Sequence, residues 1–561
     1  MEKPEHQLLS RLSEEPALVT RGSDAVDCEG EVVFIDQRDV REVKEMDLTG
    51  KIILTPESSA WFAEAFEKGA LGLVSYSNYI SPLHDPDQVM FDMSLSKGKT
   101  KNKVFSFQIS QRLGYQLRDM VLQGQKVVLH AKTKTAEFPF KLDTVFAAVK
   151  GTNPEKKGLM FTAHLFERPE RSLDFLWIEG GAGTMAFFRK YPEMEGRLFG
   201  AINMDMVGEN LDENHAFFNI ENPYYSKSTF LTSAVKDFAD FTFVANLPTS
   251  DFQAPTAWMP LPFPMVENNG SLQAFRYRMT PYRGGSDHGL FLESDAGIPA
   301  LSFNVWPDLS YHTDKDLPEK SDPTQLKRVA FIAAASSLAM CSGKDDVLEG
   351  LIRETQADRL VFIQEAMARS ASSLERLKTG DKGVTFKNAL NNISEAVRIS
   401  QEALGGIKEL VRDKPKAAKS LDLVNSSFGK LGISLVDNLR GIYTGTAGVY
   451  GYQAEFAKPT VDEQKLEKII PRKIKPIRMA DRFPYTDLLS GLRKNPALQK
   501  SVFLKYSFNG LVEMLIAVDG KKSLGQIRNL LSFEFTPVDA ADMLDMAKSL
   551  EEAKLIETTQ K

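Results

Sequence analysis

The chain has 561 residues, 42% of them hydrophobic and 26% charged, with a formal net charge of -6 at pH 7. This is an ordinary globular composition, and the length calls for more than one hydrophobic core, so we expect three or four domains. The small negative charge gives no global reason to bind nucleic acid or an anionic membrane surface.

The cysteines and the N-terminus indicate the compartment. Cys28 and Cys341 lie far apart in the sequence, which is not a disulfide framework and fits a reducing environment. The first residues, MEKPEHQLLSRLSEEP, lack the apolar stretch of a signal peptide. No apolar run reaches the roughly 18 residues that a membrane span needs. We therefore expect a cytoplasmic protein that does not enter the membrane.

The first part of the chain is expected to be β-rich. Residues 1–30 are interpreted as an N-terminal segment that packs on the domain of residues 151–345. In residues 31–150 the short runs VVFID, KIILT and LGLVSYS predict strands, and WFAEAFEKGA and QRLGYQLRDMVLQG predict helices. The order of GKIIL, a helix and KGALGLVSYS resembles a protease-associated domain. Any other small α/β module is the alternative.

Residues 151–345 alternate strands with helices. The apolar runs GLMFTAH, LDFLWIE, GRLFGAINMDMVG and PALSFNV are typical of buried, mostly parallel strands. Helical segments such as STFLTSAVKDFADF and PTQLKRVAFIAAASSLAM lie between or after them. The pattern predicts a three-layer α/β domain. Ligands of open α/β sheets bind beyond the carboxyl ends of the strands, so the polar residues there are the candidate site.

The rest of the chain divides into a helical region with a connector, residues 346–490, and a compact C-terminal unit. Residues 346–415 are strongly helical, whereas 416–485 are less periodic and include the basic stretch PRKIKPIR, interpreted as a solvated linker. Residues 491–561 predict two helices and a β-prone end, which suggests a winged helix. Because basic and acidic residues nearly balance there, we favour a protein contact over nucleic-acid binding.

Short motifs at predicted strand ends carry the candidate chemistry. FTAH ends at His164, NMDMVGEN contains Asp205, YHTDKDLPEK contains His312, and GGSDHGLF contains Asp287 and His288. Two imidazoles and a carboxylate at the ends of separate strands suit zinc. Taken singly, each histidine can be a structural residue and Asp205 a helix cap or turn residue.

In this order, and together with FLW followed by GTMAFF, GIPAL and FRYRMTPYRGGSDHGLF, the motifs resemble the co-catalytic zinc aminopeptidases of clan MH, in the branch that carries a protease-associated domain. The resemblance spans roughly residues 1–345.

The resemblance implies a role for each matching residue. His164 and Asp205 match ligands of one zinc ion, and His312 matches a ligand of the other. Tyr311 matches a hydroxyl that stabilises the oxyanion of the tetrahedral intermediate. Asp287 and His288 match the segment that shapes the pocket behind the ligands.

The sequence also departs from the family pattern. Leu165 and Phe166 follow His164, so the Asp of the family's His-x-Asp motif is missing, and no segment supplies the carboxylate that bridges two metals. The family's glutamate pair is reduced to Glu179. Only eight residues, 165–172, join two strands that normally need a crossover of a dozen or more. Either the strands are rewired, or one face of the sheet is left bare for residues 346–415 or a partner chain to cover.

These departures set the functional expectation. Without the bridge we expect one zinc ion or none rather than two, with His164, Asp205 and His312 as ligands and Glu179 or Glu167 as base. The chain is then a zinc aminopeptidase-like protein, hydrolysing N-terminal peptide bonds by metal-activated water if active, with the two-zinc activity weakened or lost.

The alternative is a relative that binds peptide or protein without hydrolysis. The expected partners are therefore a peptide or protein and a second copy of the chain, with no membrane. A deletion in the gene would leave the same gap.

Overall fold

The structure is a computed structural model of the chain. It describes residues 1–560 apart from 14, 16, 37–42, 44–45, 59–61, 78–84, 93–94, 137–144, 150–157, 161–169, 247–264, 376–380 and 482–507. In this described part no helix is both long and apolar enough to cross a bilayer.

The N-terminal domain is built on a five-stranded sheet of order β4-β3-β2-β1-β5. Its elements are β1 (Asp27–Phe34), β2 (Lys51–Thr55), α2 (Ala63–Glu67), β3 (Gly72–Ser75), β4 (Phe105–Gln108), α3 (Gln111–Leu122) and β5 (Val128–Lys132). Neighbouring strands from β1 to β4 pair in parallel, and β5 runs antiparallel to β1. The strands and helices expected in this region are found. The protease-associated assignment stays a prediction.

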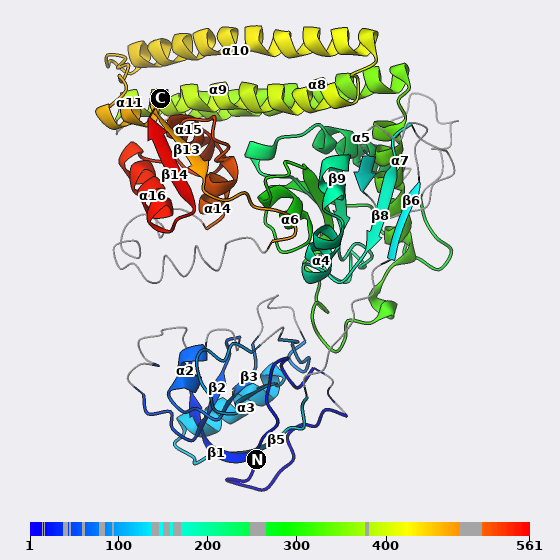
Figure 1. Cartoon of the computed structure of the whole chain (residues 1–561), viewed down its shortest axis with the longest axis vertical. Coiled ribbons are helices and arrows are strands. Elements are labelled where there is room, and N and C mark those ends of the chain that lie inside the picture. The colour runs from blue at the N-terminus through cyan, green and yellow to red at the C-terminus, as the bar shows by residue number, and fades with distance from the viewer. Residues whose placement is uncertain are drawn as a thin grey trace.

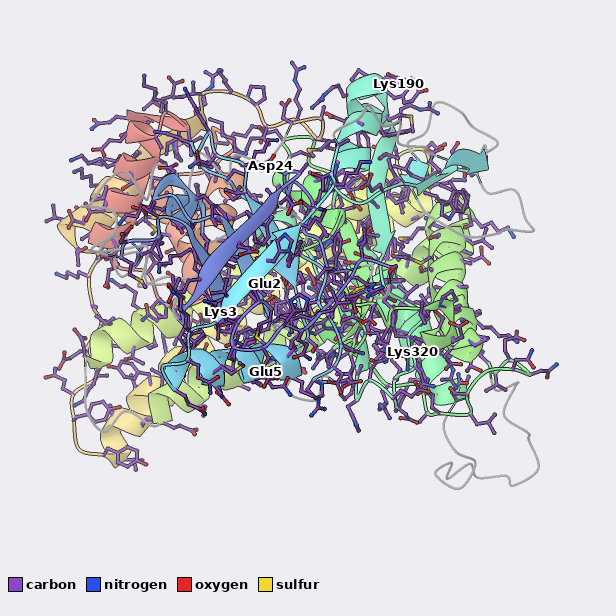
Figure 2. All side chains as sticks on the ribbon, turned by 90° about the horizontal axis from the view of Figure 1, so that it is seen from below. Glu2, Lys3, Glu5, Asp24, Lys190 and Lys320 are labelled. Carbon is purple, nitrogen blue, oxygen red and sulfur yellow. The ribbon has the colours of Figure 1, made fainter. Side chains whose placement is uncertain are left out.

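The first residues of the chain pack on this N-terminal sheet. Lys3 forms an antiparallel bridge with Val128, and Val19 forms one with Phe107. Figure 2 shows Glu2 and Lys3 beside strands of the sheet. The sequence placed residues 1–30 on the peptidase-like domain, but these contacts place them on β4 and β5, because main-chain pairing with a sheet edge satisfies their polar groups.

The central domain has a seven-stranded sheet of order β11-β10-β12-β9-β7-β8-β6. The strands are β6 (Val145–Val149), β7 (Gly158–Met160), β8 (Leu173–Trp177), β9 (Leu198–Met204), β10 (Phe217–Glu221), β11 (Tyr277–Thr280) and β12 (Ala300–Trp306). Pairing is parallel except between β10 and β12 and between β6 and β8. The mostly parallel sheet is confirmed. Its antiparallel members and the edge strand β11 were not predicted.

Helices cover both faces of this sheet. They are α4 (Ala182–Lys190), α5 (Leu231–Ala245), α6 (His288–Glu293) and α7 (Pro323–Cys341). Val235 of α5 and Ile332 of α7 share a core with Leu301 of β12. Phe188 of α4 and Leu292 of α6 belong to a second core that includes Ala300, the neighbour of Leu301. Alternating residues of β12 therefore face different helices, as in a three-layer arrangement.

The short connection between β7 and β8 does not rewire the sheet. Leu159 pairs with Leu173 in parallel register. Most of the connection lies outside the described residues, but its end is anchored: Glu170 N donates to Cys341 O (3.0 Å) and Arg171 Nη2 donates to Glu409 O (2.6 Å). The helical region thus contacts the end of the shortened connection, one of the two coverings expected from the sequence.

Long helices form the next layer, namely α8 (Asp345–Glu375), α9 (Lys382–Gly406) and α10 (Pro415–Val449), with α10 outermost (Figure 1). The expectation of an irregular connector from residue 416 onward is wrong, since α10 runs unbroken for 35 residues. Its buried side chains, Leu421, Phe428, Leu439 and Tyr443, keep helical spacing. Gly441, Gly445 and Gly448 near its end obscured the pattern, and packing overrides their low propensity.

The C-terminal unit combines helices with a two-stranded sheet. Its elements are α11 (Val461–Leu466), β13 (Ile469–Lys473), α14 (Phe508–Ala517), α15 (Leu524–Glu534), α16 (Ala540–Glu552) and β14 (Ile556–Gln560). β13 pairs antiparallel with β14, so the start of the basic stretch is a strand and not a solvated linker. Every second side chain of such a two-stranded ribbon can stay in water, which suits a basic sequence. The winged-helix assignment stays a prediction.

A buried carboxyl pair joins this unit to the central domain. Glu513 Oε1 accepts from Ser226 N (2.9 Å), Glu513 Oε2 accepts from Ser226 Oγ (3.0 Å), and Glu534 Oε2 accepts from Tyr225 N (3.2 Å). Burial raises the pKa of Glu513 to about 7 and raises the pKa of Glu534 well above its usual range. The contact is therefore protonated in the folded protein over a range where free carboxyls are ionised.

Candidate functional site

The central sheet has one polar face near the strand ends. Asn203 of β9, Ser302 of β12, Glu221 of β10 and Thr280 of β11 are register partners and form one row across the strands. Asn304, Asn219 and Arg278 form the next row. Asn219 Nδ2 donates to Asn304 Oδ1 (3.0 Å), and Arg278 Nε donates to Asn219 Oδ1 (2.6 Å). The alternate residues, such as Ile202, Leu301 and Ile220, lie in the core. Period-2 alternation thus makes one face of the sheet a polar floor.

Asp205 stands at the end of β9 beside this floor. Its main-chain N donates to Phe303 O (3.1 Å), which continues the pairing with β12 for one residue. Ser286 Oγ donates to Asp205 Oδ2 (2.6 Å), and Asn203 Nδ2 donates to Ser286 Oγ (2.8 Å). The carboxylate is exposed and is oriented by a chain of hydrogen bonds, as a metal ligand requires.

Asp287 and His288 anchor the loop that covers the polar floor. Asp287 Oδ1 accepts from Gly181 N (2.7 Å), in the turn after β8, where Gly181 has a φ of 65°. His288 Nε2 lies 2.8 Å from Glu221 Oε1, and both side chains are buried. That same oxygen accepts from Arg283 N (2.7 Å). The two residues thus fix neighbouring loops.

Tyr311 and His312 follow β12 in a tight turn. Their rings stack with centroids 3.7 Å apart, and His312 adopts a φ of 56°, which is uncommon for a residue with a Cβ. Burial lowers the pKa of His312, while the carboxylates of Asp316 and Asp205 act in the opposite direction. Burial, with Asp205 and Asp308, raises the pKa of Tyr311. The site thus favours a neutral imidazole and a protonated phenol.

The N-terminal domain reaches this turn, a contact that the sequence did not predict. Phe91 N donates to His312 O (2.5 Å), and Met90 bridges Thr313 in antiparallel fashion. The rings of Phe91 and His312 meet edge to face at 6.3 Å. The unusual backbone of His312 is therefore held from a segment more than two hundred residues away in the chain.

Asp205 and Tyr311 line one cavity of about 230 Å³. Its other walls are Met206, Asn219, Glu221, Thr280, Arg283, Gly284, Gly285, Ser286, Ser302, Asn304 and Trp306. The residues of the polar floor were missed in the sequence. The signal that could have found them is the polar residue at every second position within otherwise apolar strands.

The remaining predicted residues lie apart from this cavity or outside the described part of the chain. His164 and Glu167 are outside the described residues. Glu179 is exposed after β8, and its carbonyl accepts from Gly183 N (3.1 Å) at the start of α4. Its successors Gly180 and Gly181 form the turn bound by Asp287.

A zinc site at Asp205 and His312 fits the donors present but needs another ligand. Carboxylate oxygen and imidazole nitrogen both suit zinc, and catalytic zinc usually has three protein ligands. In the described ranges, no group of three ligand atoms within 4.8 Å of one another includes Asp205 or His312. Such a group does occur at Glu2, Glu29 and His130 of the N-terminal domain. His164, the third ligand expected from the sequence, lies outside the described residues.

Comparison with known proteins gives a family match for the central domain and a curated relative for a shorter stretch. Residues 159–337 match the family described as Peptidase family M28, and this segment contains every candidate residue from His164 to His312. A curated protein, farnesyl diphosphate synthase of Escherichia coli (strain K12), is 28% identical over 133 residues. That match covers 23% of this chain and 42% of the enzyme, so the chain spans less than half of that relative.

Solved structures of peptidases also show similarity. An aminopeptidase from Aneurinibacillus sp. strain AM-1 has a TM-score of 0.36 at 18% identity, and a peptidase M28 precursor from Shewanella amazonensis SB2B has 0.39 at 16%. Each match covers 58% of this chain and 77% of the other. A peptidase from Clostridium acetobutylicum described as putative has 0.32 at 10%, covering 60% and 64%. At these scores the likeness adds no detail to the site.

Proposed function

We propose that this chain, whose residues 159–337 form a domain of peptidase family M28, is a zinc-dependent aminopeptidase-like protein that binds the N-terminal residue of a peptide beside Asp205 and Tyr311. The observation that carries the proposal is the cavity that Asp205 and Tyr311 line together, beside the polar floor near the strand ends. Members of the family are typically zinc-dependent. Ligand sites of α/β sheets lie at this edge.

Asp205, His312 and His164 are the proposed ligands of one zinc ion. When bound, zinc polarises a carbonyl and lowers the pKa of a water molecule. Ser286 holds the Asp205 carboxylate in one orientation, and the contact with Phe91 holds the backbone of His312. The lowered pKa of His312, caused by burial, favours the neutral imidazole that coordination needs.

Tyr311 is the proposed oxyanion donor. Burial raises the pKa of its phenol, so the hydroxyl keeps its proton and can donate a hydrogen bond to a developing negative charge. Glu179 is the proposed base, since it is the carboxylate left in the segment where the family carries two. A misplaced base costs about 10²–10⁴-fold in rate, so we expect hydrolysis to be slow compared with a two-zinc enzyme.

A second candidate is a peptide-binding protein without hydrolysis. The exposed position of Glu179 and the glycine turn that follows it favour this alternative. The cavity and its hydrogen-bonding groups would then retain the recognition of a peptide N-terminus.

The test is hydrolysis of fluorogenic aminoacyl amides by zinc-loaded protein. The proposal predicts slow, zinc-dependent turnover that Tyr311→Phe reduces at least tenfold in kcat with little change in KM. Tyr191→Phe, on the exposed end of α4, is the control. No turnover by wild-type protein that nevertheless binds peptides would select the second candidate, and turnover unaffected by Tyr311→Phe would contradict the assigned role.

A further inference from the structure

We propose that the cavity beside Asp205 is a specificity pocket for an acidic side chain, glutamate or aspartate, at the N-terminus of the bound peptide, and that Arg283 recognises its carboxylate. The inference rests on the proposed function for its peptide ligand. It names the substrate class of that site.

The charge of the pocket is the first argument. Arg283 lines the cavity, its side chain is exposed, and in the described part of the chain no carboxylate lies within salt-bridge distance of its guanidinium. The two carboxylates of the wall are already engaged, Asp205 by Ser286 and Glu221 by His288 and main-chain N–H groups. Arg283 is the basic residue among those that line the cavity, and a guanidinium pairs well with a carboxylate.

An unsatisfied hydroxyl is the second argument. Thr280 is 4% exposed and lines the cavity, and its Oγ1 has no hydrogen-bond partner among the described residues. Buried polar atoms without partners are rare and costly, so an orphaned hydroxyl in a cavity wall indicates a ligand that completes it. Thr280 is the register partner of Glu221, and Glu221 Oε1 accepts from Arg283 N. Thr280 and Arg283 therefore lie on the same wall of the cavity.

Size and lining exclude other side chains. A cavity of about 230 Å³ is below the roughly 300–1,000 Å³ of sites for drug-sized ligands, so it suits one amino-acid side chain. A lysine or arginine side chain would place a second cation next to Arg283. A large apolar side chain would leave the Thr280 hydroxyl unsatisfied, and sites built for hydrogen bonds discriminate strongly against such analogues. Trp306 can contact the methylene groups of glutamate.

The experiment measures kcat/KM for glutamyl, aspartyl, glutaminyl, leucyl and lysyl fluorogenic amides with zinc-loaded protein. We expect the glutamyl or aspartyl substrate to lead by at least tenfold. Arg283→Glu should abolish that lead and favour the lysyl substrate. Lys190→Glu, at the end of α4 and labelled in Figure 2, makes the same change in net charge away from the cavity and should change nothing.

Binding of free L-glutamate, L-glutamine, L-leucine and L-lysine by calorimetry separates this inference from the proposed function. If wild-type protein hydrolyses nothing but binds L-glutamate, and Arg283→Glu loses that binding, the pocket assignment holds while the peptidase activity fails. Thr280→Val should weaken L-glutamate binding several-fold without lowering the melting temperature. Equal binding of all four amino acids, or L-glutamate binding that survives Arg283→Glu, overturns the inference whatever the peptidase assay gives.

Discussion

Ser286 shows how a residue of little apparent chemistry controls the site. Its hydroxyl donates to Asp205 Oδ2 and accepts from Asn203, so it fixes the proposed zinc ligand from behind. Partners of this kind typically contribute about 10–100-fold to metal affinity. Removing such a partner leaves the metal ligand in the protein but no longer fixes the orientation of its side chain.

We predict that Ser286→Ala lowers zinc affinity by about 10–100-fold, measured by competition with a fluorescent chelator. Ser286→Thr keeps the hydroxyl and should restore most of the affinity. Unchanged affinity in Ser286→Ala would mean that Asp205 does not bind the metal or needs no orientation.

At this scale the sequence identified the residues that end strands but not those that the sheet brings beside them. Asp205 and Tyr311 could be predicted because each follows an apolar run and matches a family motif. Asn219 and Thr280 have the signal of polar residues at every second position of a strand, but their place beside Asp205 depends on the pairing of strands far apart in the chain. The place of Phe91 depends on a contact between domains.

Glycines within helices have different effects according to what they contact. In α3, a Cβ on Gly114 would lie 2.1 Å from Cγ of the buried Tyr76, so the glycine allows the helix to approach β3. In α10, a Cβ on Gly441 would meet nothing within 4 Å. The first glycine serves packing, and the second only lowers helix propensity.

We predict opposite effects for the two alanine variants. Gly114→Ala should destabilise the N-terminal domain by about 1–3 kcal/mol through overpacking. Gly441→Ala should stabilise α10 by about 0.5–1 kcal/mol. Chemical denaturation followed by circular dichroism checks both, and a Gly114→Ala protein as stable as wild type would contradict the packing.

Local sequence signals explain which strands and helices could be predicted. The strand β2 is a short apolar run, and the helix α7 has a clear start, where Asp322 accepts from Thr324 N. The length of α10 was missed because its glycines resemble a loop signal, while its stability comes from α8 and α9. Tertiary packing overrode local propensity there.

At the scale of the whole molecule, the C-terminal unit is joined to the central domain through protonated carboxyls. Between about pH 4.5 and pH 7, Glu513 keeps a proton in the folded state that it would release in the unfolded chain, because burial raises its pKa to about 7. The folded state then binds more protons, so its stability falls as pH rises through this window. The difference amounts to on the order of 3 kcal/mol.

We predict that the melting temperature of the full chain falls between pH 5 and pH 8, and that the double variant Glu513→Gln and Glu534→Gln flattens this dependence. The amides remove the ionisable protons and keep most of the shape. Glu551→Gln, on α16 away from the contact, is the matched control. A double variant that melts with the wild-type pH dependence would show that this contact does not govern the linkage.

The measurement that tests the central claim most directly is zinc per chain, determined by elemental analysis after purification without chelators, in wild-type protein and in the double variant Asp205→Asn and His312→Ala. We predict about one zinc ion in the wild type and none in the folded variant. Glu2, Glu29 and His130 form another group that could hold a metal ion. The variant Glu29→Gln is the control for this group and should leave the zinc count at one. Two ions lost together, or a folded wild-type protein without zinc, would contradict a single-zinc site at Asp205 and His312.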